Sequence, residues 1–246
     1  MADFPYLYRG SHAGAVRYGE EDQYDASFRE NVVCARAIEQ AIRDHWDEAS
    51  GELAEGCAQS VLERYGFKRV NFVLANSLQE LKKSGCGHLV SEETYQWGQD
   101  TFVPQDGEYN RYYRVDTAVQ LLEGFIRQAQ EAYQALGLFG LEHCAGNQHE
   151  LDYTGKVLVL SPDTLKESCW TPRDQLWVAE GGFGCSPAAR GQAVYATCLG
   201  DGEKTRWNRA DFIGVLKDEF LPDWAAQKLE ELQSQKQSGP TMGGMG

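Results

Sequence analysis

Cysteine and histidine side chains in the second half of the chain are numerous enough for a tetrahedral zinc site, since thiolate and imidazole groups are ligands that Zn²⁺ prefers. These residues are His143, Cys144, His149, Cys169, Cys185 and Cys198. Structural zinc sites usually contain paired ligands two to four residues apart, whereas these cysteines are single and most lie in strand-like runs. The spacing therefore favours structural cysteines, and we expect no metal and no cofactor.

Two glycine-flanked cysteines, Cys86 and Cys185, are the candidates for a nucleophilic thiol. The histidines that could act as their base are His88, His143 and His149. Cysteines beside glycines are also common in unreactive loops, so an enzyme that depends on a metal or a cysteine in the second half is the alternative hypothesis. The cluster at residues 181–184, GGFG, lacks the Lys-Ser/Thr pair of a phosphate-binding loop and predicts a tight connection between strands.

Arg69, Asn76 and Gln79 are polar residues beside or within an apolar helical segment. Their spacings of seven and three allow all three to share one helix face. We therefore take them as candidate binding residues, in a polar strip that recognises a partner. The alternative is that Asn76 and Gln79 hydrogen-bond neighbouring backbone inside a helical bundle, as buried amides usually do.

Long stretches of helical spacing fill the first 136 residues. The pattern predicts a helix from Ser27, with Ser27 and Glu30 as a capping box, and a second helix that starts near Leu53 and ends at Gly66. Further helices are expected over residues 68–82, over residues 92–97, and from a cap at 116 or 117 to residue 137. Residues 20–137 are thus predicted to form a helical bundle.

The hydrophobic period changes after Gly140. Short apolar runs at 156–160, 175–179 and 193–199 predict strands. Asp201-Gly202 predicts a hairpin with a type I′ turn into residues 203–207, and Pro222 predicts the start of a final helix. The expected fold class is therefore α+β: a helical domain, a β-rich domain over residues 138–236 with a terminal helix, and a disordered tail over 237–246.

Composition adds limits on partners and location. The chain has 246 residues with 37 acidic and 23 basic side chains, a net charge of −14. Negative charge disfavours direct binding of nucleic acid, because that binding depends on Lys and Arg at phosphates. The sequence contains neither a membrane span nor a signal peptide, so a cytoplasmic location is expected. A further alternative is that Trp170, Trp177 and Trp207 stack on a small ligand or on single-stranded nucleic acid.

Both halves of the chain carry a resemblance to known sequences. In the first half two stretches carry it: CARAIE at 34–39 followed by AI at 41–42, and YGFKRV at 65–70 followed by VLANSLQ at 73–79. They resemble an uncharacterised domain family found in accessory proteins of conjugative and integrative elements of Gram-positive gut bacteria, often near antirestriction proteins. The second half, from DYTGK at 152–156 through LPDWA at 221–225, is similar to another uncharacterised module from the same kind of element.

The resemblance implies a setting, and the charge suggests a mode of action. Residues 1–136 hold 22 acidic and 13 basic side chains, a net charge of −9 that suits a basic groove on a partner. We therefore hypothesise a non-catalytic accessory protein of a mobile genetic element. It would bind a protein partner, such as a basic nucleic-acid-binding protein of a host defence system, in an antirestriction or anti-CRISPR role.

Overall fold

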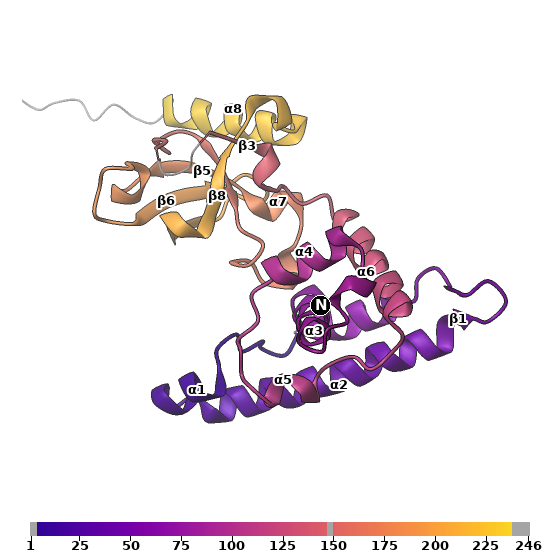
Figure 1. Cartoon of the computed structure of the whole chain (residues 1–246). Helices are drawn as coiled ribbons and strands as arrows, with labels where there is room; N and C mark the ends of the chain where they lie inside the picture. Colours follow the sequence, from indigo (N-terminus) through magenta and orange to yellow (C-terminus); the bar gives the residue numbers. More distant parts are fainter. Residues whose placement is uncertain (1–3, 147–149, 238–246) are drawn as a thin grey trace, which may run out of the picture. The chain divides into compact units, whose positions relative to one another are not determined.

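The computed structural model of the chain describes residues 4–146 and 150–237 and contains two compact units, residues 1–135 and 136–246. The first unit is helical, and the second contains a six-stranded sheet and a C-terminal helix (Figure 1). The predicted α+β fold class is thus confirmed. Of the predicted tail over 237–246, Gln237 is the last residue of the final helix, and the remainder lies outside the described residues.

Six α-helices and a short hairpin make up the described part of the first unit. They are α1 (His12–Tyr18), α2 (Glu21–His45), β1 (Trp46–Asp47), β2 (Glu52–Leu53), α3 (Gln59–Lys83), α4 (Glu92–Asp100), α5 (Tyr109–Tyr112) and α6 (Val119–Gln134). Helices α2, α4 and α6 all pack against α3, whose buried residues include Leu74 and Leu78. Fully buried Ile38 of α2 and Phe125 of α6 belong to the same core, so α3 is the central element of this unit.

Helix α2 begins at Glu21, six residues before the predicted start at Ser27. Ser27 is not a cap: its hydroxyl accepts a hydrogen bond from the backbone N–H of Tyr8 at 2.9 Å. Glu21 and Asp22 stand in the first turn, where negative side chains complement the helix dipole. The capping-box prediction is therefore wrong, because the hydroxyl serves a contact with a distant segment.

Leu53 lies in strand β2 and not in a helix, so the predicted second helix is wrong in its first residues. Helix α3 begins at Gln59 and is interrupted at Gly66, where φ is 77° and ψ is 159°. The helical conformation resumes after Gly66, which confirms the predicted helix over 68–82. Only glycine adopts this backbone conformation without strain, so Gly66 sets the kink.

The last two predicted helices are present with altered ends. Helix α4 is capped by the Ser91 hydroxyl, which accepts the N–H of Thr94. Helix α6 begins at Val119, after Ala118, without a side-chain cap, so the predicted cap at 116 or 117 is wrong. The backbone N–H of Asp116 donates instead to the buried carboxylate of Glu39 at 2.8 Å, which places Asp116 before the helix.

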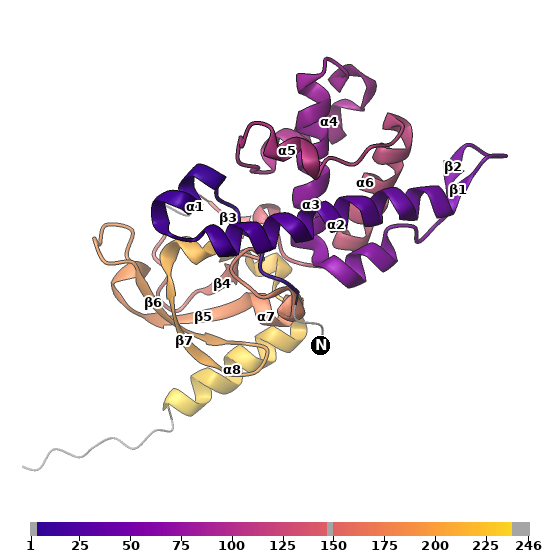
Figure 2. The same cartoon turned by 90° about the horizontal axis from the view of Figure 1, so that it is seen from below.

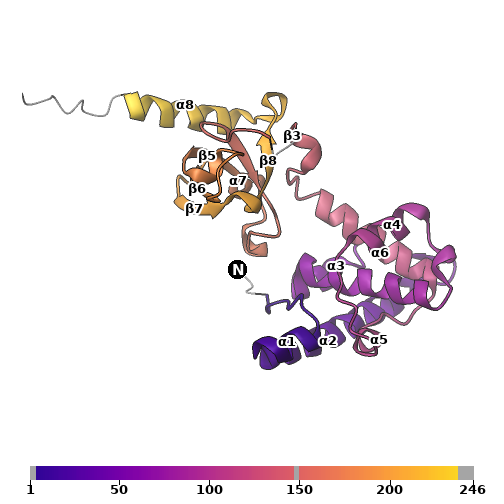
Figure 3. The ribbon, with the colours of Figure 1, turned by 60° about the vertical axis from the view of Figure 1, so that its left-hand side comes forward.

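The second unit contains one antiparallel sheet with the strand order β3-β8-β4-β5-β6-β7. Its elements are β3 (Cys144–Ala145), β4 (Val157–Leu160), α7 (Pro172–Gln175), β5 (Leu176–Gly181), β6 (Ala193–Cys198), β7 (Lys204–Asn208), β8 (Phe212–Leu216) and α8 (Asp223–Gln237). Helix α8 covers one face of the sheet (Figure 3), where Val159 and Val178 pack with Ala225. The predicted strands and the final helix are confirmed, whereas β3 and β8 were not predicted.

The hairpin between β6 and β7 is confirmed, but its predicted turn type is wrong. Gly202 has φ of 84°, and no non-glycine residue of the described chain has positive φ, so Asp201 does not adopt the type I′ conformation. The glycine cluster after β5 is a tight connection. A Cβ at Gly182 would lie 2.3 Å from the carbonyl oxygen of Ala193, and one at Gly184 equally close to that of Gln192.

No helix within residues 4–146 and 150–237 has an apolar stretch long enough to cross a membrane.

Replacing Gly66 by alanine is expected to lower the free energy of unfolding by about 1–3 kcal/mol, because a Cβ strains the observed φ and ψ. Gly124→Ala in α6 is the control, since its Cβ would meet Leu53 at 3.4 Å, an ordinary contact, and alanine favours the helix by up to about 1 kcal/mol. Urea denaturation of both variants measures the difference. Equal stability of Gly66→Ala and wild type would contradict the proposed role of the kink.

Candidate functional site

Arg69, the first candidate binding residue, is buried in the core of the helical unit with an exposed fraction of 1%. Its guanidinium donates to the carbonyl oxygens of Ser27 at 3.0 Å, Pro5 at 3.0 Å and Tyr6 at 2.9 Å, and to the side-chain oxygen of Asn31. Arg69 thereby joins α3 to α2 and to the segment that precedes α1. These bonds occupy both terminal nitrogens of the guanidinium within the protein.

Asn76 is also fully buried, and it forms a paired amide contact with Asn110. Asn76 donates to the carbonyl oxygen of Asn110 at 2.8 Å, and Asn110 Nδ2 donates to Asn76 Oδ1 at 2.9 Å. Half-buried Gln79 donates to the carbonyl oxygens of Gly98, in the last turn of α4, and Thr101, just after it, at 2.8 and 3.1 Å. This is the backbone-bonding alternative that the sequence left open for Asn76 and Gln79.

The three residues do not form an exposed strip in this structure. Arg69 and Asn76 are inaccessible to a partner while the helical unit is folded, and Gln79 is the one with partial exposure. Their common property is that each ties a helix to a segment distant in sequence. Their evident role here is to position backbone.

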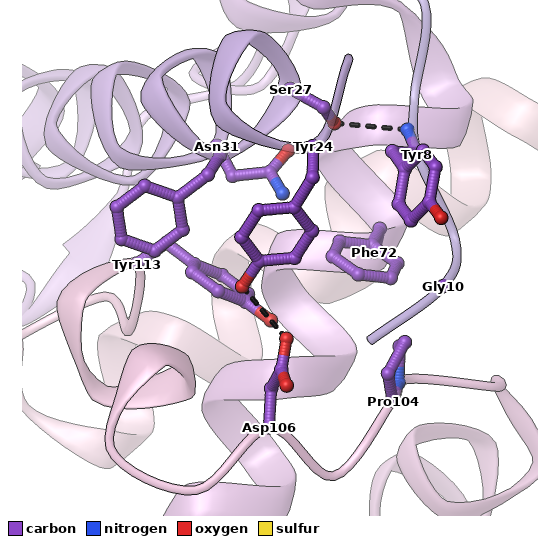
Figure 4. A pocket seen from close by; sticks show the side chains of 10 residues that line it. Tyr8, Gly10, Tyr24, Ser27, Asn31, Phe72, Pro104, Asp106 and Tyr113 are labelled. Carbon is purple, nitrogen blue, oxygen red and sulfur yellow. Dashed lines mark hydrogen bonds between the residues drawn. The ribbon is translucent and has the colours of Figure 1, made fainter. Parts of the chain in front are cut away.

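A small pocket near Arg69 brings several tyrosines together around Asp106 (Figure 4). Asp106 accepts hydrogen bonds from the Tyr24 hydroxyl and from the backbone N–H of His12, both at 2.7 Å. The His12 ring stacks on Tyr109 at 5.0 Å between ring centroids. The cavity volume is about 10 Å³, the lower limit for one water molecule, so this pocket is a structural junction rather than a metabolite site.

A larger, open depression of about 520 Å³ lies between the N-terminal segment and α2. Its lining includes exposed Tyr6, Gln23 and Arg29. Ser27 is the buried polar residue of the lining, and its hydroxyl already accepts the N–H of Tyr8. The depression therefore offers size, but its one buried polar side chain is already hydrogen-bonded within the protein.

The cysteines of the second unit do not form an activated or metal-binding cluster. Among the described residues, no three His, Cys, Asp or Glu side chains meet where they could hold a metal ion; His149 lies outside these residues. Burial raises the pKa of Cys144 and of Cys198 to about 11, and it also raises that of Cys185. Reactive thiols require the opposite shift, which electropositive surroundings provide.

Two of the three candidate tryptophans of the second unit are core residues. Trp170 and Trp177 are buried, and their indole N–H groups donate to the carbonyl oxygens of Pro162 at 2.8 Å and Asp174 at 2.7 Å. Half-buried Trp207 packs edge-to-face on Trp177 at 5.2 Å. The hypothesis that these three rings stack on a ligand is therefore corrected, since Trp170 and Trp177 have no open ring face.

One group of exposed acidic residues lies on a hairpin that sequence reasoning missed. Residues 44–55, DHWDEASGELAE, contain five carboxylates and no Lys or Arg; we call this segment the acidic hairpin. All five carboxylates are exposed: Asp44, Asp47, Glu48, Glu52 and Glu55. Two features of the sequence could have predicted this hairpin. Ser50-Gly51 is a typical turn pair, and the carboxylates around it lie between the end of one predicted helix and the start of the next.

The acidic hairpin has a defined backbone. Trp46 pairs with Leu53 across β1 and β2, and Gly51 closes the turn with φ of 72°. Gln128 of α6 anchors its base by donating to the Ala54 carbonyl at 3.0 Å. The tip extends beyond the helices of its unit in two orthogonal views (Figures 1 and 2).

Charge and exposure distinguish the acidic hairpin from an ordinary connection. Hydrogen bonds from the Ala49 N–H and then from Ser50 lower the pKa of Asp47, because they stabilise its charged form. Trp46 retains an exposed fraction of 45% among these carboxylates. Tryptophan is enriched among the residues that contribute most binding energy at interfaces, so exposed Trp46 is a candidate contact residue.

The fold and the site define an α+β protein whose helical unit presents an exposed acidic hairpin. Residues 7–134 match the family described as "Protein of unknown function (DUF3849)", and this is more than half of the chain, so the chain belongs to that family. No curated protein and no solved structure matches the chain.

Tyrosine burial in the first unit predicts a loss of stability in alkali. Burial, and then the hydrogen bond to Asp106, raise the pKa of Tyr24, and burial also raises that of Tyr113. In the unfolded chain a tyrosine loses its proton near pH 10, so the stabilisation is complete below about pH 10 and is lost as the pH rises further.

Tyr24→Phe removes one titrating group. Above pH 10 the unfolding free energy should decrease with pH less steeply in this variant than in wild type. The difference between the two slopes should be up to about 1.4 kcal/mol per pH unit.

Urea denaturation from pH 7 to pH 11, with circular dichroism as the signal, measures this slope. A Tyr24→Phe chain that loses stability as steeply as wild type would contradict the assignment. The neutral-pH stability of the variant is recorded separately, because the substitution also removes the hydrogen bond to Asp106.

Proposed function

We propose that this chain is a non-catalytic binding protein that docks a basic protein partner on the acidic hairpin. The observation that carries the proposal is the half-exposed Trp46 among five carboxylates on an anchored hairpin. Leaving a large aromatic ring in water forgoes about 25 cal/mol per Å² of apolar surface. A partner that covers Trp46 recovers this free energy.

The carboxylates supply a second contribution. A cluster of one charge sign attracts an oppositely charged partner over roughly a Debye length and fixes its orientation. The cluster contains no Lys or Arg, so a basic surface meets no repelling charge within residues 44–55. A groove that normally holds phosphates is the complementary surface, and the acidic hairpin would then act as a mimic of nucleic acid.

The proposed setting comes from the sequence resemblance. We infer a cytoplasmic accessory protein of a mobile genetic element whose partner is a nucleic-acid-binding component of a host defence system. Inhibition would be of the antirestriction or anti-CRISPR type. A cysteine-dependent enzyme is not proposed as a second candidate, because burial raises the pKa of the second-unit thiols Cys144, Cys185 and Cys198, opposite to activation.

The test uses purified restriction endonucleases and CRISPR nucleases as probes, with inhibition of DNA cleavage and direct binding as readouts. Wild type should inhibit at least one enzyme, and the inhibition should weaken as salt rises from 50 to 500 mM. The variant Asp47→Lys/Glu48→Lys/Glu52→Lys should lose at least about tenfold in affinity, and Trp46→Ala about tenfold.

The control variant is Glu219→Lys/Glu230→Lys/Glu231→Lys, which changes net charge equally at exposed positions of the second unit. It should inhibit like wild type. Equal weakening of both triple variants would mean that net charge alone acts, and absence of any inhibition by wild type across the panel would remove the proposal. Urea denaturation checks that the hairpin variants remain folded, with changes within about 0.5 kcal/mol.

A further inference from the structure

Strands β6 and β7, together with the connection from β5 to β6, carry a surface of opposite character to the acidic hairpin. Two aromatic rings are exposed there, Phe183 at 78% and Tyr195 at 54%. Three cations accompany them: Arg190, Lys204 and Arg206. We call these five residues the aromatic edge.

The strand register brings the main members together. Tyr195 of β6 is the direct partner of Arg206 on β7, and Thr197 is the partner of Lys204. Direct partners in an antiparallel pair lie on the same face of a sheet, as do residues two apart on one strand. Tyr195, Lys204 and Arg206 therefore share one face at the edge of the sheet.

The glycine-rich connection places Phe183 beside this face. A Cβ at Gly182 would lie 3.1 Å from the Tyr195 ring, so the residue before Phe183 is in contact with that ring. Gly191 lies against Phe183, where an added Cβ would come within 2.8 Å of Phe183 Cβ. Arg190 immediately precedes Gly191, which brings a third cation to the same loop.

The cations of the aromatic edge are mostly uncompensated. Within residues 4–146 and 150–237, neither Arg190 nor Arg206 forms an ion pair within 4 Å, and Lys204 has Glu180 at 3.6 Å. Positive charge on an edge strand also prevents edge-to-edge pairing between copies. Preventing edge-to-edge pairing does not require two exposed aromatic rings beside the charges. The combination of cations and exposed rings therefore needs another explanation.

We propose that the aromatic edge binds single-stranded nucleic acid. Arg206, Lys204 and Arg190 would contact phosphates, and unpaired bases would stack on Tyr195 and Phe183, the combination that single-strand binding surfaces use. Two other anionic ligands fit this surface less well. In a duplex the base faces are stacked inside the helix, and an acidic peptide pairs with the cations through carboxylates that do not stack on the aromatic rings. The net charge of −14 makes the interaction weak and strongly dependent on salt. The acidic hairpin is not involved.

The experiment measures fluorescence anisotropy of a labelled 12-nucleotide single strand with the full chain, in DNA and RNA form. At 25 mM salt wild type should bind the single strand at least about tenfold more tightly than a duplex of equal length. The logarithm of affinity should fall against the logarithm of salt concentration with a slope of about −2, as three phosphate contacts predict for a single strand.

Tyr195→Ala/Arg206→Ala should weaken binding about tenfold or more, whereas the matched control Arg17→Ala/Tyr18→Ala, an exposed Arg and Tyr of α1, should bind like wild type. Thermal unfolding followed by circular dichroism establishes that both variants are folded. The proposal is overturned if wild type does not bind at 25 mM salt, or if the two double variants bind equally. It is also overturned if a polyglutamate peptide binds as tightly as the single strand, because the surface would then recognise acidic protein.

Discussion

The buried guanidinium of Arg69 is the interaction on which the helical unit depends. A charged group of this kind is expensive to remove from water, so its N–H donors must find acceptors inside the protein. Three of these are backbone carbonyl oxygens, of Pro5, Tyr6 and Ser27. Because backbone acceptors cannot move independently of the chain, the N-terminal segment is held across α2 and α3. Tyr8 then reaches Ser27, and the Asp106 junction forms between α1, α2 and the segment before α5.

The function we propose follows from what this core leaves exposed. Helix α2 is fixed along its first half by Arg69 and by the Tyr24 contact with Asp106, and its other end continues directly into β1 of the acidic hairpin. A rigid support of this kind lowers the entropy lost when a partner binds. The aromatic edge of the second unit has a comparable support, because β6 and β7 extend a sheet whose centre is packed against α8. The chain thus carries two surfaces of opposite charge, one on each unit.

Sequence patterns predicted most of the architecture. They failed for polar residues, because the same residue type occurs both at buried structural positions and at exposed binding positions. The spacing of Val70, Leu74 and Leu81 correctly predicted the part of α3 over residues 68–82, because a buried helical face has a distinct period. A buried Arg69 or Asn76 has the same sequence signature as an exposed one, since only the tertiary fold supplies their partners. The two-residue strands β1, β2 and β3 are too short for an alternation to be visible. Strand β8 contains Gly214, which weakens its sequence pattern; glycine is needed there because an added Cβ would lie 2.8 Å from Cys144 Cβ.

The measurement that tests this account most directly is the hydrogen-exchange rate of the Tyr8 amide in wild type and in Arg69→Met, with exposed Arg64→Met as the matched control. The account predicts that this amide, which donates to Ser27, is protected in wild type and in Arg64→Met and exchanges rapidly in Arg69→Met. The amide of Phe125 in α6 should stay protected in all three chains, which shows that the core remains folded. A Tyr8 amide that exchanges rapidly in wild type, or stays protected in Arg69→Met, would contradict the central role of Arg69.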